Sequence, residues 1–308
     1  MILVPYKLDV GLYNIPYLTV LVCLICLVVF LSQKESEVNF QRSLKSYCEV
    51  NVNGDLRTIV DHVEMDHVNG CASVFMTIRM SDRRDATLSE IASGVRGIDF
   101  YPNRIDDLKY KQDTLKNGFG HFQDVVPNPL TNRLAYRSDR YDFTTMITST
   151  FAHASWSHLL GNLFFFFVFG SCVECLVGSL HFSVCFVVMA VTTSLAFSYS
   201  IATGDAIPTI GLSGVAMGMM ALLTTLLPQA KIWCFFWFLL YVRKFTLPIM
   251  AIALWYICWN IYDLRSDHSS HINYMAHVSG AVTGVLLGIG YRLFASRRLQ
   301  EAMVEARA

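Results

Sequence analysis

The chain has 308 residues, of which 54% are hydrophobic and 16% are charged, and its mean hydropathy is +0.42. Soluble domains are roughly 45–50% apolar and about 25% charged, so this composition indicates a membrane protein. The 24 basic and 24 acidic residues give a formal net charge of zero, and no dense basic run departs from this balance, which excludes the usual nucleic-acid-binding classes.

The first predicted membrane helix runs from Ile15 to Leu31, so residues 1–31 form an N-terminal segment with its first span. Only Lys7 precedes this helix as a basic residue, and no small-residue cleavage site follows it. We therefore interpret it as an uncleaved anchor and not as a signal peptide.

A long polar segment, residues 32–150, follows the first span and is large enough for a small folded domain. It contains helix-like stretches at 88–98 and 106–116, which predict an α-rich extramembrane insertion. Cys48 and Cys71 lie in this insertion and can pair as a disulfide if it faces an oxidising compartment.

Further apolar stretches approach the roughly 20 residues that a bilayer-crossing helix needs. The aromatic stretch from Ile232 to Val242 has only about 11 residues, too few to cross, and is interpreted as an interfacial or re-entrant segment. The expected fold is thus an all-α polytopic membrane protein with six transmembrane helices. The five expected after the first are Trp156 to Val177, Leu180 to Ile201, Pro208 to Leu227, Leu247 to Leu264 and Tyr274 to Leu293.

The distribution of Lys and Arg near the span ends predicts the orientation. The basic tail at 295–308 and the connection between the fourth and fifth spans carry several basic residues, whereas the connection between the third and fourth carries none. We therefore expect both termini in the cytoplasm, the 32–150 insertion outside, and the protein in a plasma or inner membrane.

The first polar constellation in the apolar region is the sequence Gly211-Leu212-Ser213-Gly214. Polar groups in a membrane are costly, so such residues indicate function. Glycine allows close approach of other backbone, and the N–H groups of a first helical turn can bind an oxyanion. Gly214 and Gly218 also give this span a face of small residues, which by itself is typical of helix packing.

The second constellation is His277, near the start of the sixth span, followed by Gly280, Gly284 and Gly288 at intervals of four. This stripe permits a close approach to the fourth span, so a contact between Ser213 and His277 is possible. Ser213 is about five residues into its predicted span and His277 about three. At about 1.5 Å per residue, both are expected roughly 5–8 Å below the same surface.

The third constellation is His153, His158 and Asn162, around the start of the second span. His158 and Asn162 are four residues apart and share a helix face. Their side chains are expected at the depth of the serine and the histidine, where they can stabilise an oxyanion. Helix capping and interfacial anchoring explain His153 equally well.

The three motifs together, over residues 148–293, resemble the rhomboid family of intramembrane serine proteases. The resemblance implies a rhomboid-like catalytic core at 151–294, with Ser213 as nucleophile and His277 as base in a dyad. It also implies that His158, Asn162 and the backbone beside Leu212 stabilise the oxyanion, and it implies no cofactor or metal. The supporting positions are His153, Gly211, Gly214, Met217 and Gly280.

Four positions depart from the family pattern. Thr144-Thr145 stand where a Trp-Arg pair is frequent, Met217 stands where an aromatic often packs on the catalytic histidine, and Ser279 replaces a frequent glycine. Methionine fills such a space but stacks less rigidly.

The resemblance implies an intramembrane serine endopeptidase whose substrates are membrane proteins with helix-weakening transmembrane segments. The alternative is a catalytically inactive, client-binding relative, although such proteins usually lose the serine or the histidine. A transporter is disfavoured because the spans show no two-fold repeat. Three further polar features are interpreted as structural and not as catalytic or metal-binding. Glu174 and Asn260 are expected to be interhelical hydrogen-bonding residues, and the loop with Asp267, His268 and His271 is expected to be solvated.

Overall fold

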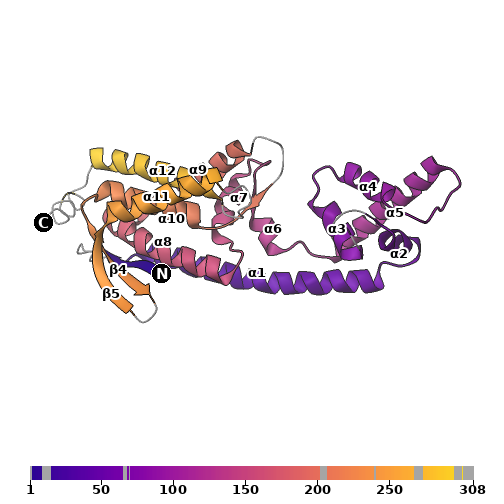
Figure 1. Ribbon diagram of the computed structural model, residues 1–308, viewed down its shortest axis with the longest axis horizontal. Coiled ribbons are helices and arrows are strands. Elements are labelled where there is room, and N and C mark those ends of the chain that lie inside the picture. The colour runs from indigo at the N-terminus through magenta and orange to yellow at the C-terminus, as the bar shows by residue number, and fades with distance from the viewer. Residues whose placement is uncertain are drawn as a thin grey trace. The chain divides into compact units, whose positions relative to one another are not determined.

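The computed structural model describes residues 2–8, 15–64, 68, 70–201, 207–238, 241–266, 273–294 and 300, most of which are helical (Figure 1). The chain divides into two compact units. The bundle unit comprises Met1–Leu31 and Arg133–Ala308, and the insertion unit comprises Ser32–Asn132. Residues 133–150, expected in the insertion, therefore belong to the bundle unit. The loop with Asp267, His268 and His271 and nearly all of the basic tail lie outside the described residues.

Long helices make up most of the bundle unit. Its first helix, α1, starts at Tyr17 and continues well beyond the expected end at Leu31, to Val50 in the insertion unit. The other helices are α7 (Phe143–Thr148), the 3-10 helix η1 (Ser149–Phe151), α8 (Trp156–Val177), α9 (Ser179–Ser200), α10 (Ser213–Leu226), α11 (Ile249–Ser266) and α12 (Tyr274–Leu293).

The boundaries of α8 follow from local chemistry. Ser155 is its N-cap, and the Ser155 hydroxyl accepts a hydrogen bond from the backbone N–H of His158. The helix ends at Gly178, whose φ of 84° is a conformation that residues with a Cβ rarely adopt. Glycine at this position lets the chain turn directly into α9.

Glu174 anchors the start of α1 to α8. Its buried carboxylate accepts hydrogen bonds from the backbone N–H groups of Leu18 and Thr19, at 3.0 and 2.8 Å, and from the hydroxyls of Thr19 and Ser179. These two N–H groups belong to the first turn of α1, where the helix dipole also favours a negative charge. The glutamate is thus an interhelical hydrogen-bonding residue, as the sequence suggested.

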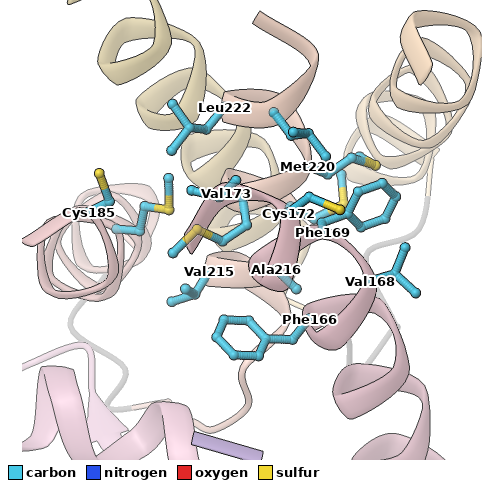
Figure 2. Close-up of a cluster of buried hydrophobic side chains, with 14 of the residues drawn as sticks. Phe166, Val168, Phe169, Cys172, Val173, Cys185, Val215, Ala216, Met220 and Leu222 are labelled. Atoms are coloured by element: carbon cyan, nitrogen blue, oxygen red, sulfur yellow. The ribbon is translucent and has the colours of Figure 1, made fainter. Parts of the chain in front are cut away.

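The core of the bundle unit is built around α10. Nearly all of its residues from Gly214 onward are buried, as expected for a helix that is apolar on every side. Figure 2 shows side chains of three helices packed in this cluster, among them Phe166 of α8, Cys185 of α9 and Val215 of α10. This packing fixes the start of α10 relative to its neighbours.

Three helices in the described part of the chain are long and apolar enough to cross a membrane: α1, α8 and α9. The bundle unit also exposes many large apolar side chains, as a lipid-facing surface requires. Examples are Leu21, Val28, Leu160, Leu180, Trp255, Trp259 and Leu286.

The expectation of an all-helical fold is wrong for the segment from Ile232 to Val242. Its described residues, up to Phe238 and from Tyr241 on, belong to a three-stranded antiparallel sheet with the order β1-β4-β5, in which Lys231 pairs with Pro248. Aromatic side chains favour strands, and pairing with a second segment satisfies backbone groups that an 11-residue interfacial segment leaves open. The strands are β1 (Ile2–Leu8), β4 (Lys231–Phe238) and β5 (Tyr241–Pro248).

The fourth predicted span starts too early in the sequence. Pro208–Thr209 forms the short strand β3, which pairs with β2 (Tyr136–Arg137), and α10 starts only at Ser213. Ser213 is therefore the first residue of its helix and not the fifth or sixth. The φ of Gly211 (126°) is far from helical values, which explains why the helix cannot begin before this residue.

The insertion unit folds around its own hydrophobic core, which includes Phe75, Ile91, Leu115 and Phe122. Its helical content agrees with the expectation for this segment. Besides the second part of α1, its helices are α2 (Gly54–Asp61), α3 (Gly70–Met80), α4 (Arg84–Ser93), α5 (Arg104–Val125) and the start of α6 (Leu130–Leu134).

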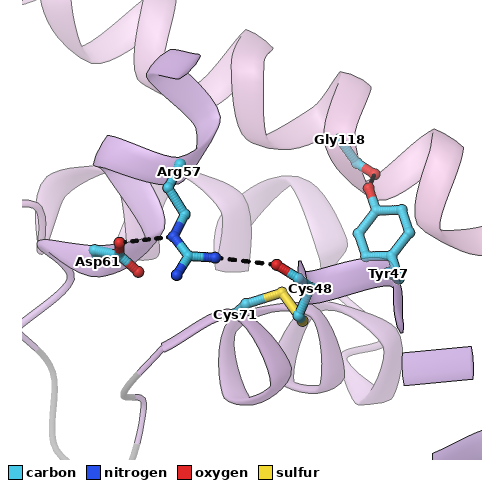
Figure 3. The surroundings of a disulfide bond; sticks show 6 residues. All are labelled: Tyr47, Cys48, Arg57, Asp61, Cys71 and Gly118. Atoms are coloured by element: carbon cyan, nitrogen blue, oxygen red, sulfur yellow. Dashed lines mark hydrogen bonds and ion pairs between the residues drawn. A yellow bond between two sulfur atoms is a disulfide. The ribbon is translucent and has the colours of Figure 1, made fainter. Parts of the chain in front are cut away.

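A disulfide between Cys48 and Cys71 joins α1 to α3 (Figure 3). Beside it, the hydroxyl of the buried Tyr47 donates to the carbonyl of Gly118 in α5, at 2.7 Å. A guanidinium N–H of Arg57 donates to the carbonyl of Cys48. The end of α1 is thereby tied to α2, α3 and α5.

A buried ion pair stabilises the start of α5. The Lys111 ammonium lies 2.6 Å from the Asp107 carboxylate, and both side chains are buried. The carboxylate also accepts hydrogen bonds from the backbone N–H groups of Phe100 and Tyr101. Burial alone raises the pKa of Asp107, but these hydrogen bonds outweigh it and lower the pKa below its ordinary value.

Candidate active site

The first residue of α10 and the first turn of α12 meet at a serine–histidine contact. Ser213 Oγ lies 2.7 Å from Nε2 of His277, although the residues are 64 positions apart in the chain. This is a hydrogen-bond distance for a nucleophile and its base. The structure thus brings together the two residues on which the sequence interpretation depends most.

Interlocking glycines bring the backbones of α10 and α12 into direct contact. A Cβ added at Gly280 would lie 2.1 Å from the carbonyl oxygen of Gly214, and one added at Gly284 equally close to that of Gly218. No larger side chain fits at these positions without moving a helix. The small-residue stripes read from the sequence therefore set the separation of the two helices that carry Ser213 and His277.

The start of α12 is held by Asn273. Its side-chain oxygen accepts from the backbone N–H of Ala276, and its amide nitrogen donates to the Thr209 hydroxyl at 3.0 Å. The cap fixes the first turn that presents His277, and the second bond joins it to strand β3. Sequence reasoning missed Asn273, although an asparagine just before an apolar helix is a recognisable capping signal.

His158 and Asn162 lie across from Gly211, just before α10. A Cβ on Gly211 would lie 3.0 Å from Nε2 of His158 and 3.7 Å from the amide nitrogen of Asn162. Ala154 N–H donates to Nδ1 of His158 at 3.4 Å, so in neutral His158 the proton is on Nε2, which faces Gly211. The Asn162 amide nitrogen is buried and has no hydrogen-bond partner among the described residues.

The start of α10 supplies backbone donors. Its first intrahelical bond runs from Ala216 N–H to the Leu212 carbonyl, so the N–H groups of Ser213 and Gly214 precede it. Leu212, which the sequence placed beside the oxyanion site, is fully buried and is not among the described residues that line the cavity. Gly211 is held in place by a hydrogen bond from its N–H to the Ser149 carbonyl.

Two of the supporting positions lie away from the reacting atoms. His153 is buried, and its ring lies edge-on to the His158 ring, with centroids 5.2 Å apart. Met217 is buried in the core of the bundle unit. The aromatic contact of His277 comes instead from Tyr274 on its own helix, with centroids 6.2 Å apart.

A cavity of about 570 Å³ opens at the serine–histidine pair. Ser213, His277, His158 and Asn162 all line it. Much of the remaining lining consists of small or hydroxyl-bearing side chains: Ser149, Thr150, Ala154, Ser157, Thr193, Ser194, Thr209 and Gly214.

The cavity, the serine–histidine contact and the unused donors occur in a chain segment that matches a known family. Residues 140–294, just over half of the chain, match the model of the rhomboid domain. The chain belongs to the rhomboid family. The rhomboid domain contains the whole cavity lining, whereas the insertion unit lies before it.

Two rhomboid relatives illustrate how far the similarity extends. The chain is 31% identical over 144 residues to "Rhomboid-like protein 11, chloroplastic" of Arabidopsis thaliana, and this alignment covers 46% of the chain and 50% of the relative. It is 28% identical over 162 residues to "Presenilin-associated rhomboid-like protein A, mitochondrial" of Danio rerio, and this alignment covers 50% of the chain and 39% of the relative. The matched regions thus span half or less of each relative.

Asn260 of α11 forms an interhelical hydrogen bond, as the sequence led us to expect, but its partner is a residue of the site. Its side-chain oxygen lies 2.6 Å from Nδ1 of His277 in α12. The signal in the sequence was a lone amide in an apolar helix, which indicates a polar partner but not which one.

Proposed function

We propose that this rhomboid protein is an intramembrane serine endopeptidase that cleaves transmembrane segments of other membrane proteins near the outer membrane face. The observation that carries the proposal is the 2.7 Å contact between Ser213 Oγ and His277 Nε2. In the chemistry that follows, Ser213 Oγ attacks a peptide carbonyl carbon while its proton passes to Nε2. The imidazolium then protonates the leaving amine, and water hydrolyses the acyl-enzyme with His277 again as base.

The oxyanion of the tetrahedral intermediate is stabilised from the opposite wall of the cavity. Nε2–H of His158 and the amide of Asn162 lie beside Gly211, and the N–H groups at the start of α10 are the further donors that we assign to this oxyanion site. The buried Asn162 amide nitrogen has no hydrogen-bond partner among the described residues, which costs free energy that a bond to an oxyanion would offset. The fixed donors need no reorganisation when the negative charge develops.

The length of α10 is consistent with chemistry inside the membrane. Its 14 residues span about 21 Å, whereas a bilayer hydrocarbon core is about 30 Å thick. We place six helices across the membrane, namely α1, α8, α9, α10, α11 and α12. A central helix of this length leaves Ser213 below the membrane surface, with a cavity through which water reaches it.

We place the insertion unit outside the cytoplasm and both termini inside, in a plasma or inner membrane. The Cys48–Cys71 disulfide supports this orientation, because disulfides persist in oxidising compartments. With six spans, the N-terminal ends of α8, α10 and α12 then face the external side. The cut is accordingly expected near the outer face.

The substrates are membrane proteins whose transmembrane helices are easily unwound. A helical substrate has its carbonyls in intrahelical hydrogen bonds, so the segment must open before Ser213 can attack. Glycine and proline lower the cost of that opening.

The test is cleavage of a panel of single-span substrates by the full chain in proteoliposomes, beside Ser213→Ala and His277→Ala. Cleavage by the wild type with loss in both variants is the expected result. A fluorophosphonate probe should label the wild type at Ser213 and leave Ser213→Ala unlabelled. A wild type that binds the spans but neither cuts nor reacts with the probe refutes the protease and favours the inactive, client-binding protein.

A further inference from the structure

Asn260 bridges the site histidine to the backbone of α11. The side chain of Asn260 is only 9% exposed. Its Oδ1 lies 2.6 Å from His277 Nδ1, and its Nδ2 donates to the carbonyl oxygen of Tyr256, one turn earlier, at 2.8 Å. Both polar ends of the amide are therefore used.

The direction of these hydrogen bonds follows from the donors and acceptors available. A backbone carbonyl only accepts, so the NH₂ group of Asn260 must face Tyr256 and its oxygen must face the histidine. His277 Nδ1 must then carry the proton. In a neutral imidazole this leaves Nε2 unprotonated and able to accept the Ser213 proton.

We propose that Asn260 is a positioning residue for the proposed proteolytic reaction, on which this inference rests. Asn260 selects the tautomer of His277 that accepts from Ser213 and fixes the plane of its ring. When His277 takes up the serine proton, the amide oxygen stabilises the imidazolium through its dipole. Ser213, His277 and Asn260 thus form a hydrogen-bonded chain across α10, α12 and α11.

A neutral amide suits this environment better than a carboxylate. A second charge buried in an apolar bundle is costly unless it is fully paired. The Tyr256 carbonyl prevents the amide from turning round, because a turned amide would place two oxygens against each other. A turned amide would also donate to Nδ1 and move the histidine proton to Nε2, the tautomer that cannot act as base.

The test uses the full chain in proteoliposomes with Asn260→Ala and Asn260→Asp. In Asn260→Ala we expect kcat to fall about 10- to 100-fold, the cost of one hydrogen bond to a group that becomes charged, while KM changes by less than about twofold. The rate of fluorophosphonate labelling at Ser213 should fall with kcat.

In Asn260→Asp, the carboxylate again accepts from Nδ1 and restores part of kcat. It also favours the imidazolium, so the acid limb of the pH–rate profile should move to higher pH. Among the described residues, the other titratable side chains near His277 are His158 on the cavity wall and Tyr274, whose ring lies beside the His277 ring, and both are unchanged in the two variants. A purely structural role for Asn260 would move neither the acid limb nor the split between kcat and KM.

The matched control is Thr283→Val. It removes the 3.0 Å hydrogen bond between the hydroxyls of Thr283 in α12 and Thr192 in α9, neither of which lines the cavity. This variant should keep kcat within about twofold. The inference is overturned if the kcat of Asn260→Ala stays within threefold of the wild type. If the alanine variant fails to fold, an acid limb of the pH–rate profile that does not move in Asn260→Asp overturns it instead. A wild type that neither cuts nor labels at Ser213 is a different outcome, because it refutes the protease itself.

Discussion

Replacement of Gly280 by alanine is expected to separate the serine from the histidine. The added Cβ would lie 2.1 Å from the Gly214 carbonyl oxygen, and at least 3.0 Å is needed, so α12 must move away from α10 by about 0.9 Å or more. The contact between Ser213 Oγ and His277 Nε2 would then lengthen from 2.7 Å to about 3.6 Å, beyond hydrogen-bond range. A misplacement of about 1 Å costs on the order of 100-fold in rate, and this is the fall in kcat that we expect.

The assay is cleavage of a reporter substrate in proteoliposomes, together with the thermal unfolding midpoint of each variant. Gly290→Ala is the matched control, because it lies on the same helix and a Cβ there meets nothing within 4 Å. It should cleave like the wild type. If Gly280→Ala keeps more than half of the wild-type kcat, the close backbone contact does not set the geometry of the site, and the reasoning is refuted.

Three further predictions concern the oxyanion donors and the insertion unit. Asn162→Ala should lower kcat by about 10²–10³-fold with little change in KM, measured with the same reporter; an unchanged kcat would remove Asn162 from the proposed site. Joint replacement of Cys48 and Cys71 by serine should destabilise the insertion unit by about 3.4 kcal/mol, the loop entropy for a separation of 23 residues, and amide hydrogen exchange in α3 and α5 measures this. Burial raises the pKa of Asp107, but its hydrogen bonds, chiefly from Lys111, lower the pKa overall below the ordinary value of 3.8. The stability that Asp107 contributes is therefore fully present above pH 3.8 and is lost as the pH falls through the lower pKa of the folded state. The hydrogen-exchange protection factors of α5 should therefore fall with acid below pH 3.8 in the wild type and depend less on pH in Asp107→Asn.

The sequence predicted the residues of the site better than the elements that hold them. Ser213, His277, His158 and Asn162 were recognisable because polar groups are rare in an apolar chain, and all four line one cavity. The start of the serine helix was predicted several residues too early, because hydropathy does not distinguish a short strand and turn from the first turn of a helix.

The β1-β4-β5 sheet escaped prediction for a different reason. Strand β4 acquires its partners from residues 2–8 and from β5. A short aromatic run reads equally well as an interfacial segment, and only the pairing of distant backbone groups decides between the two.

The sequence by itself determined that the chain is a mostly helical membrane protein, and its motifs predicted the family and the site residues. Composition, glycine spacing and the position of polar residues are local properties, and they persist whatever the chain packs against. Only the tertiary structure decided which groups meet. It placed Asn260 against Nδ1 of His277, Asn273 against Thr209, and Cys48 in a bond to Cys71. Each of these contacts joins different secondary-structure elements, and their meeting depends on helix rotation and separation, which the packing of the whole unit sets.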